Sequence, residues 1–305
     1  MNTTVDSATI EVLILTINQR EQTLRCLEQL RASGGGRPGF GITVWDNGST
    51  DGTREAISKR YPDVNLFGSD ENLGVAGGRN AVAHAIIADR RPDFLLFLDN
   101  DMAVGKDFVA ALASPFFGPQ GAVIGQTQAK LRLAHDPGKL NDGGGCNIQF
   151  WLGRTRPVGF GEVDNGQFDT PRRCMACCGG AMMVRRDLFE TLGGFDESFN
   201  PFGPEDIDFS LRLQKLGYEA WYIPAAAALH DVNHTIGAGY SEEYAVNRSQ
   251  HWMRLMKRHA SFFDWIGFVF AGVPLILFRV LLREGRRSNL AAIRGLVRGA
   301  LGRGR

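Results

Sequence analysis

The sequence predicts an α/β fold with a mostly parallel central sheet that is covered by helices. Apolar runs of strand length alternate with segments of helical spacing from residue 10 to residue 99. Such alternation is typical of parallel sheets, whose faces are covered by the connecting helices. The chain has 305 residues, of which 44% are hydrophobic, so it can bury a large core and is not disordered as a whole. A charged fraction of 22% argues against a protein with many membrane spans.

The first half of the chain contains the clearest pattern. We expect strands at 10–17, 41–45, 64–68 and 94–98, and helices at 23–32, 52–60 and 77–88. The run from Phe94 to Leu98 is entirely apolar, as in a strand that is buried on both faces. Open α/β sheets bind ligands beyond the carboxyl ends of their strands. Asp46 and Asp99 stand at two such ends and are candidate site residues.

The second half is less regular. From about residue 103 to residue 173 the pattern weakens into loops rich in Gly, Asp and Pro, with strand candidates at 122–126 and 146–151. Beyond these loops we expect strands at 179–184, 221–223 and 226–230, and helices at 186–192, about 204–216 and 242–259. We therefore predict a main domain over 1–240, with halves at about 10–102 and 103–240, and C-terminal helices over 241–305.

The strongest local motif is Asp99-Asn100-Asp101, directly after the buried strand. Two carboxylates at a strand end offer the hard oxygen ligands that Mg²⁺ and Mn²⁺ prefer, and they leave coordination positions for the phosphates of a substrate. A turn that only closes the strand is the structural alternative for this triplet taken alone.

Other polar and glycine-rich segments lie near the same predicted edge. The first strand is followed by Asn18, the second by the segment from Asp46 to Gly52, and the segment from Asn72 to Asn80 opens a helix. Glycines permit a close backbone approach, and the start of this helix, together with Arg79, favours an anionic ligand. The segment matches neither the phosphate-binding loop of nucleotide triphosphatases nor the dinucleotide fingerprint.

In their order along the chain, these motifs resemble those of the family-two inverting glycosyltransferases, which have the Rossmann-like GT-A fold. The resemblance covers about residues 10–235 and continues through Gly180 to Arg186, Gly193 to Glu197 and Pro204 to Leu213. The last of these segments resembles the rhamnosyltransferase-like branch. The resemblance implies transfer of a sugar from a nucleotide-diphosphate donor, UDP- or dTDP-linked, to a hydroxyl of a glycan or lipid-linked acceptor, in the synthesis of cell-envelope polysaccharide.

The resemblance also implies roles for individual residues. The donor is expected to lie against Thr16, Asn18, Asp46, Asp51, Asn72, Gly74, Arg79, Asp99 and Asn100. Asp99, Asp101 and His230 are expected to hold Mn²⁺ or Mg²⁺, which stabilises the departing nucleoside diphosphate. Asp206 is the expected general base, and Glu205 orients it or the acceptor. Without the family, acidic residues at 205, 206 and 208 would be explained by the dipole of a helix N-terminus.

The cysteines and the N-terminal segment indicate a compartment. Five irregularly spaced cysteines, in a chain long enough to fold without disulfides, predict reduced thiols and a cytoplasmic protein. The segment Cys174 to Cys178 lacks a second pair of ligands for zinc, so buried thiols are the preferred interpretation. Met1 to Ile10 does not have the basic and then apolar pattern of a secretion signal.

The C-terminal segment combines apolar and basic residues. Residues 265–278 carry no charge, and the tail 279–305 holds eight Arg and one Glu, a net charge of +7 that leaves 1–278 at −6. Fourteen apolar residues are short for a bilayer span but suit a segment in the interface, where anionic headgroups attract the tail. We therefore expect a peripheral protein on the inner face of the cell membrane. A core or oligomer-interface helix with a solvated tail is the structural alternative.

Two other functions share parts of these signals. A nucleotidyltransferase that makes sugar nucleotides would use the same sheet and metal chemistry, but the Glu205-Asp206 pair and His230 disfavour it. A non-catalytic nucleotide-sugar-binding membrane scaffold would use the basic tail, but the intact acidic positions disfavour it. Binding of nucleic acid is not expected, because the body of the chain is acidic.

Overall fold

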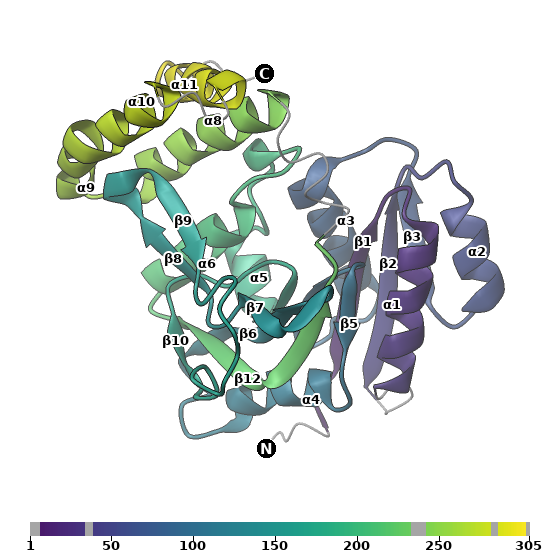
Figure 1. Ribbon diagram of the computed structural model, residues 1–305. Coiled ribbons are helices and arrows are strands. Elements are labelled where there is room, and N and C mark those ends of the chain that lie inside the picture. Colours follow the sequence, from purple (N-terminus) through teal and green to yellow (C-terminus); the bar gives the residue numbers. More distant parts are fainter. Residues whose placement is uncertain (1–6, 34–38, 233–241, 282–285, 303–305) are drawn as a thin grey trace.

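The computed structural model describes residues 7–33, 39–232, 242–281 and 286–302 (Figure 1). Eight strands form one path in a ten-stranded sheet, in the order β10-β12-β6-β11-β4-β1-β2-β3, with β5 added beside β12 and β7 beside β6. Helices lie on both faces of this sheet, and the C-terminal helices stand together at one end of the molecule (Figure 1). The predicted α/β class with a central sheet is confirmed.

The first half forms a parallel sheet with the predicted alternation of elements. Its strands are β1 (Ile10–Thr16), β2 (Phe40–Asn47), β3 (Asn65–Ser69) and β4 (Phe94–Asp99), and its helices are α1 (Arg20–Ala32), α2 (Thr53–Arg60) and α3 (Gly74–Asp89). β1 pairs in parallel with β2 and β4, and β2 pairs in parallel with β3. All seven elements predicted for this half are present, with ends that differ by a few residues.

The second half extends the sheet with mixed pairing. Its elements are β5 (Met102–Val104), α4 (Phe108–Ala113), β6 (Ile124–Leu133), β7 (Asp136–Asp142), β8 (Cys146–Gln149), β9 (Arg154–Pro157), β10 (Arg172–Cys174), β11 (Ala181–Arg185), α5 (Arg186–Leu192), α6 (Glu205–Lys215) and β12 (Glu219–His230). Single 3₁₀ turns cover Ser114–Phe117, Phe150–Leu152 and Glu197–Phe199. β11 is antiparallel to both β4 and β6, whereas β12 is parallel to β6.

Two expectations for this half are corrected. The strand expected at 122–126 is the long β6, which pairs with β7 in a hairpin. The strands expected at 221–223 and 226–230 are one strand, β12, whose register with β6 shifts between Ile223 and Ala227. Pro224 lies in this shift and has no N–H to donate to the ladder, so the strand bulges there instead of ending.

The core consists of two apolar clusters on opposite faces of the sheet. Along β1, Val12 and Ile14 belong to the cluster that packs against α1, α2 and α4, whereas Leu13 belongs to the cluster under α3, α5 and α6. This alternation is the two-residue period of a strand with both faces covered. Burial on both faces fixes the register of β1, and therefore the positions of the side chains at its carboxyl end.

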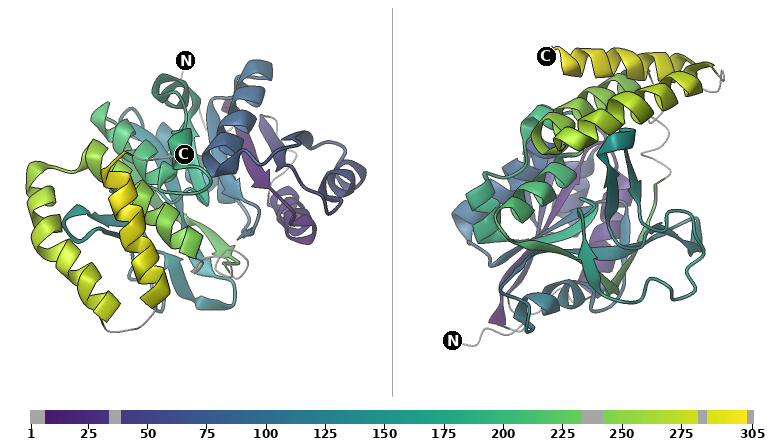
Figure 2. Two further views of the ribbon diagram at one scale, coloured as in Figure 1. Left: turned by 90° about the horizontal axis from the view of Figure 1, so that it is seen from above. Right: turned by 90° about the vertical axis from the view of Figure 1, so that its left-hand side faces the viewer.

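The C-terminal helices attach to the body through a third cluster. They are α8 (Glu242–His259), α9 (Phe262–Gly267), a π-helical turn (Phe268–Gly272), α10 (Val273–Leu281) and α11 (Arg286–Ala300). Trp252 and Met256 of α8 pack with Ile148 and Ile207 of the body, and Figure 2 shows the helices stacked on that end. Among the described residues, no helix is both long and apolar enough to cross a membrane. Arg283, Arg303 and Arg305 of the predicted basic tail lie outside the described residues.

A buried carboxylate also holds α8. The side chain of Asp208 is fully buried on α6 and accepts hydrogen bonds from Arg212 Nε at 2.7 Å and from His259 Nε2 at 2.9 Å. Arg258 Nη1 lies 3.3 Å from its Oδ1. The last turn of α8 is therefore fixed to the helix that begins with Glu205.

Candidate active site

The register of the sheet brings together the polar residues that were predicted at the carboxyl ends of its strands. In the β1–β2 pair Thr16 lies opposite Asp46, and in the β1–β4 pair Leu15 lies opposite Asp99. The carboxyl ends of three neighbouring strands therefore form one edge, because parallel strands all end on the same side of a sheet.

Asp99, Asp101 and His230 meet at this edge. One ligand atom from each of them lies within 4.8 Å of the others. They are far apart in the chain, and the pairing of β12 with β5, in which His230 lies opposite Met102, brings the histidine to the turn after β4. The structure therefore brings these three residues to one place, as a shared site requires.

The donor set fits a hard divalent cation. Oδ1 of Asp101 is buried and has no hydrogen-bond partner, and the side chain is only 8% exposed. Oδ2 of Asp101 lies 3.3 Å from Nε2 of His230. A buried carboxylate oxygen without a partner is costly, and a cation held with the imidazole would satisfy it. Carboxylate and imidazole ligands together suit Mn²⁺, and Mg²⁺ is compatible with the carboxylates.

The protonation of His230 depends on its neighbours. Its Nδ1 lies 2.9 Å from Oδ1 of Asn141, which can only accept, so Nδ1 carries the proton and Nε2 is directed at Asp101. Burial lowers the pKa of His230, but the carboxylates of Asp101 and Asp99 outweigh it and the pKa is raised. Without a cation, the imidazole is therefore more readily protonated than a free histidine.

Arg79 connects this edge of the sheet to Glu205 at the start of α6. Its buried guanidinium donates to Asp99 Oδ1 at 2.7 Å, to Glu205 Oε1 at 3.0 Å and to the carbonyl oxygen of Gly179 at 3.1 Å. A Cβ on Gly179 would lie 2.3 Å from Nη1 of Arg79, so only glycine permits this approach. Arg79 was expected beside a pyrophosphate, and the structure places it between two carboxylates.

Glu205 and Asp206 begin α6 and have different surroundings. Glu205 is buried and paired with Arg79, whereas Asp206 is only half-buried. Oδ2 of Asp206 accepts a hydrogen bond from the N–H of Gly179 at 2.8 Å, and its Oδ1 accepts one from the N–H of Ile207 at 2.7 Å. Burial raises the pKa of both carboxyl groups, and the charge of Asp206 raises that of Glu205 further. Of the two, Asp206 is the more accessible to solvent.

The candidate nucleoside end is formed by the loops after β1 and β2. Asp46 is fully buried, and its Oδ1 accepts hydrogen bonds from the N–H of Ser49 and from Arg54 Nε, but its Oδ2 has no partner. Oδ1 of Asn18 accepts a hydrogen bond from the N–H of Thr50 at 2.7 Å. Asp51 accepts hydrogen bonds from the backbone N–H groups of Arg20 and Thr53, so it ties the start of α2 to α1.

Thr16 and Asn100 form a buried network below the edge. Nδ2 of Asn100 donates to the hydroxyl of Thr16 at 3.1 Å and to that of Thr23 at 3.0 Å, and the two hydroxyls lie 2.7 Å apart. Both residues were expected to lie against the donor. Since their polar groups are buried and paired with one another, they are placed to support the turn that carries Asp99 and Asp101.

The expectation of an anionic ligand at the start of α3 is wrong. Asn200 Oδ1 accepts hydrogen bonds from the N–H groups of Ala76 and Gly77, and the carbonyl oxygen of Pro201 accepts one from Val75. The N–H of Gly74 is bonded to Asn72 Oδ1. These amides therefore have partners in the chain, and Gly74 allows the close approach of Asn200, whose Oδ1 would lie 2.4 Å from a Cβ at this position.

Three polar residues of the site were missed by sequence reasoning: Asn141, Asp142 and Asn200. Asp142 is buried and accepts hydrogen bonds from the N–H groups of Gly144 and Gly145, and burial raises its pKa to about 6. The glycine run that follows it was a signal that could have indicated a tight turn around a carboxylate. Asn141 and Asn200 carry no such signal, because their partners lie 89 and more than 120 residues away in the chain.

Two protein families match the chain. The family described as glycosyl transferase family 2 matches residues 11–193. A second, described as the N-terminal domain of galactosyltransferase, matches residues 162–236. Together these matches contain Asp99, Asp101, His230 and the acidic pair Glu205 and Asp206.

Curated proteins are similar over most of the chain. The N-acetylglucosaminyl-diphospho-decaprenol L-rhamnosyltransferase of Mycobacterium tuberculosis is 27% identical over 274 residues, which cover 83% of this chain and 88% of that protein. An N-acetylglucosaminyltransferase of Azorhizobium caulinodans is 28% identical, over 72% of this chain and 54% of that protein. The rhamnosyltransferase WbbL of Escherichia coli is 24% identical, over 55% of this chain and 65% of that protein.

Solved structures share the fold at low identity. The mannosyltransferase PcManGT of Pyrobaculum calidifontis, in complex with GDP-Man and Mn²⁺, has a TM-score of 0.58 and 18% identity, and the match covers 96% of this chain and 75% of that one. GalNAc-T7, with UDP, GalNAc and Mn²⁺, has a TM-score of 0.60 and 17% identity, and the match covers 73% and 43%.

Proposed function

Because this chain belongs to glycosyl transferase family 2, we propose that it transfers a hexosyl or deoxyhexosyl group, with rhamnosyl as the first candidate, from a UDP- or dTDP-linked donor to a hydroxyl of a lipid-linked acceptor. The chain is a glycosyltransferase, and the similarity to rhamnosyltransferases motivates the sugar. The decaprenol-linked substrate in the name of the mycobacterial relative motivates the acceptor. The proposed reaction inverts the configuration of the transferred sugar.

The observation that carries this proposal is the link between a metal-binding cluster and an acidic helix start. Asp99 and Glu205 bind the same guanidinium, Arg79, so the two clusters form one site. Transfer by a single displacement needs stabilisation of the leaving group on one side of the sugar and a base on the other. A site with these two parts fits that requirement.

The donor would lie along the carboxyl ends of β1, β2 and β4. Asp99, Asp101 and His230 would hold Mn²⁺ or Mg²⁺, which neutralises the charge that develops on the departing nucleoside diphosphate. Asp46, whose buried Oδ2 has no partner, and Asn18 in the neighbouring loop would lie at the nucleoside end of the donor. Asn72, Asp51 and Gly74 shape the loops around this end of the site.

Asp206 would accept the proton of the attacking hydroxyl. A carboxylate has about four acceptor positions, and the two N–H groups bonded to Asp206 leave free positions for that hydroxyl. The same two bonds fix the direction of the carboxylate. Its raised pKa makes it a stronger base than an exposed Asp. Glu205 is positioned to hold Arg79 and the helix start in place.

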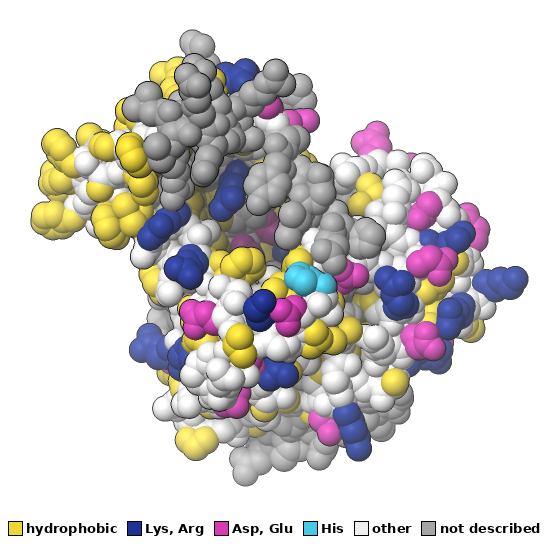
Figure 3. Space-filling model, in the orientation of Figure 1, with side chains coloured by type: hydrophobic (Ala, Val, Ile, Leu, Met, Phe, Trp, Pro, Cys, Tyr) yellow, Lys and Arg dark blue, Asp and Glu magenta, His cyan; other side chains and the backbone are white. Residues whose placement is uncertain are grey.

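The C-terminal helices would bind the surface of the membrane that contains the acceptor. Phe262, Phe263 and Phe270 are each at least 75% exposed, and hydrophobic side chains gather over α9 and α10 (Figure 3). Exposed aromatic side chains on α9 and the π-helical turn, together with the four Arg of α11, are typical of helices that lie in a membrane interface. We propose a peripheral protein on the inner face of the cell membrane.

The base can be tested separately from donor binding. Asp206→Asn should lower the transfer rate by at least about a hundredfold and leave the affinity for the nucleoside diphosphate with Mn²⁺ unchanged, because general-base catalysis contributes about 10²–10⁴. Glu205→Gln should also disturb the donor site, through Arg79. NMR of the product should show the inverted anomeric configuration. A full rate in Asp206→Asn, or a product of retained configuration, contradicts the mechanism.

A further inference from the structure

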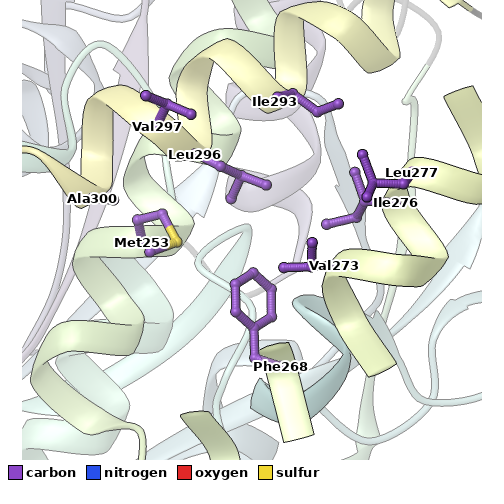
Figure 4. A pocket seen from close by; sticks show the side chains of 9 residues that line it. All are labelled: Met253, Phe268, Val273, Ile276, Leu277, Ile293, Leu296, Val297 and Ala300. Carbon is purple, nitrogen blue, oxygen red and sulfur yellow. The ribbon is translucent and has the colours of Figure 1, made fainter. Parts of the chain in front are cut away.

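An apolar groove lies between α8, α10 and α11, away from the catalytic clusters. Its volume is about 240 Å³. All the described residues that line it are apolar: Met253, Phe268, Val273, Ile276, Leu277, Ile293, Leu296, Val297 and Ala300. Figure 4 shows these side chains around a common space. Apolar cavities of about 150 Å³ already bind a benzene-sized hydrocarbon, so this groove has room for a segment of a hydrocarbon chain.

The packing of α11 differs between its two neighbours. Gly295 and Gly299 face α8, where an added Cβ would lie 2.3 Å from the carbonyl oxygen of Val246 and 2.9 Å from that of Gln250. α11 therefore lies directly on α8. Towards α10 it presents Ile293 and Leu296, and space remains there. An unfilled apolar space lowers stability, and an occupant would recover the lost contacts.

The groove and the catalytic pair share α8 as a wall. His251 of α8 faces the loop before Glu205, because its Nδ1 donates a hydrogen bond to the carbonyl oxygen of Phe202, 2.9 Å away. Met253, two residues further on and about 200° around the helix, lines the groove. Ile207, which follows Asp206, belongs to the same apolar cluster as Met253 and Phe268 of the groove. The groove therefore lies near the start of α6, which carries the catalytic pair.

The charge of α11 suits an anionic head group. The helix contains Arg286, Arg287, Arg294 and Arg298 and no acidic residue. Arg294 is paired with Glu242 of α8, and the side chain of Arg298 is exposed. A diphosphate between a hydrocarbon tail and a sugar would therefore lie beside positive charge.

We propose that this groove binds the isoprenyl tail of the lipid-linked acceptor, with the diphosphate beside α11 and the sugar at Asp206. The inference rests on the proposed function, since it requires a lipid-linked acceptor. An acyl chain of a bilayer phospholipid has the same hydrocarbon chemistry, but its head group has no reason to cross α8 towards the catalytic pair. The position of the groove beside that pair is therefore the argument for the acceptor.

The test measures the affinity of the full chain for farnesyl diphosphate. Binding is measured by calorimetry, in EDTA and without any donor. Wild type should bind farnesyl diphosphate at least about tenfold more tightly than pyrophosphate or dihexanoyl phosphatidylcholine. Val297→Trp should fill the groove and weaken this binding about tenfold or more. Val297 is 52% exposed, so the fold has room for the larger side chain.

Leu301→Trp is the matched control, because Leu301 is 62% exposed, directly follows the same helix and does not line the groove. It should keep wild-type affinity, and melting followed by circular dichroism should show that both variants are folded. Unchanged binding in Val297→Trp, or equal binding of dihexanoyl phosphatidylcholine, overturns the assignment. Sugar transfer to a water-soluble acceptor is measured separately. If sugar transfer occurs but farnesyl diphosphate does not bind, only the assignment of the groove fails. If farnesyl diphosphate binds but no sugar is transferred, only the proposed function fails.

Discussion

At the scale of single residues, Arg79 explains how several acidic side chains can share one buried site. Glu205 and Asp206 are adjacent, and burial and mutual repulsion raise the pKa of Glu205, while Arg79 opposes this rise. Burial would lower the pKa of Arg79, but Asp99 and Glu205 outweigh it, and the pKa of Arg79 is raised. The guanidinium therefore stays charged, and each carboxylate that it binds stays oriented.

Asn141 is predicted to set the metal affinity through the tautomer of His230. Asn141→Leu removes the acceptor for the Nδ1 proton, so Nε2 is no longer fixed towards Asp101. Loss of such an outer partner of a metal-binding histidine usually costs about 10–100-fold in affinity. Mn²⁺ binding measured by electron paramagnetic resonance should weaken by that factor. Asn141→Asp keeps an acceptor oxygen and should retain most of the affinity; equal weakening in both variants would refute the role of the acceptor.

The pKa of His230 predicts a pH dependence of metal binding. The pKa is raised by Asp101 and Asp99 against the effect of burial, and a protonated imidazole cannot bind a cation. Mn²⁺ affinity should therefore fall as the pH is lowered through this raised pKa, starting above the ordinary value of about 6.5. Titrations from about pH 8 down to about pH 6 would measure it. In His230→Gln the dependence over this range should become weaker, and an unchanged profile would assign it to another group.

At the scale of elements, α3 begins on a residue of the other half. Asn200 accepts hydrogen bonds from two N–H groups at the start of α3, and its Nδ2 donates to the carbonyl oxygen of Leu73. A helix N-terminus needs partners for its free N–H groups, and a ligand or a side chain can supply them. Here the chain supplies them, and α3 therefore positions Arg79 whether or not a donor is bound.

Replacement of this cap is predicted to destabilise the protein. Asn200→Ala leaves the N–H groups of Ala76 and Gly77 without their partner and should cost about 0.5–2 kcal/mol in the free energy of unfolding. Urea denaturation would measure the loss. Asn200→Asp keeps an accepting oxygen at a helix N-terminus and should cost less than Asn200→Ala. If Asn200→Ala is as stable as wild type, the cap is not a significant contact.

β12 shows how one long element carries a site residue to its place. His230 is at the end of this strand and reaches Asp99 and Asp101 because the strand continues past the bulge at Pro224. β5, directly after Asp101, then pairs with the last residues of β12. β5 is short and β12 is interrupted at Pro224 in the sequence pattern. The pairing of these two strands nevertheless determines the distance between Asp101 and His230.

At the scale of the whole molecule, the body and the C-terminal helices form a continuous structure with an exposed apolar end. The third apolar cluster joins α8 to the hairpin β8–β9 and to α6. The exposed aromatic side chains lie beyond this cluster, on α9 and the π-helical turn.

The family membership also decides between the functions considered from the sequence, since it favours sugar transfer over nucleotide transfer and over a non-catalytic scaffold.

This arrangement predicts binding to anionic vesicles. Replacing Phe262 and Phe263 together by Ser removes two side chains that are 75% and 79% exposed, so the fold should not change. Vesicle binding should fall at least about tenfold. Complete burial of one Phe contributes about 1.5–3 kcal/mol, so even partial burial of the two side chains exceeds the 1.4 kcal/mol that corresponds to a factor of ten. Flotation with phosphatidylglycerol vesicles would measure it. Phe160→Ser is the control, since Phe160 is 48% exposed and lies outside the C-terminal helices; an equal loss in this control would contradict the assignment.

Much of the fold could be predicted from the sequence, because strong local patterns specify it. The apolar run before Asp99 and the helical spacing in α1 give elements whose type does not depend on distant contacts. The hairpin β6–β7 was missed, because β6 is buried on both faces and carries polar residues such as Gln126 and Lys130 among its apolar ones. Lys130 is buried with Asp164, so its charge has a partner that only the folded chain provides.

The sequence by itself determined the α/β class, the family and the acidic residues of the candidate site, because these depend on local patterns and on the order of motifs. The tertiary structure alone decided which side chains meet. It placed Arg79 between Asp99 and Glu205, paired His230 with Asn141 and closed the start of α3 with Asn200. The physical reason is that a hydrogen bond between residues far apart in the chain depends on strand register and helix packing, and neither leaves a local signal at the residues that it joins.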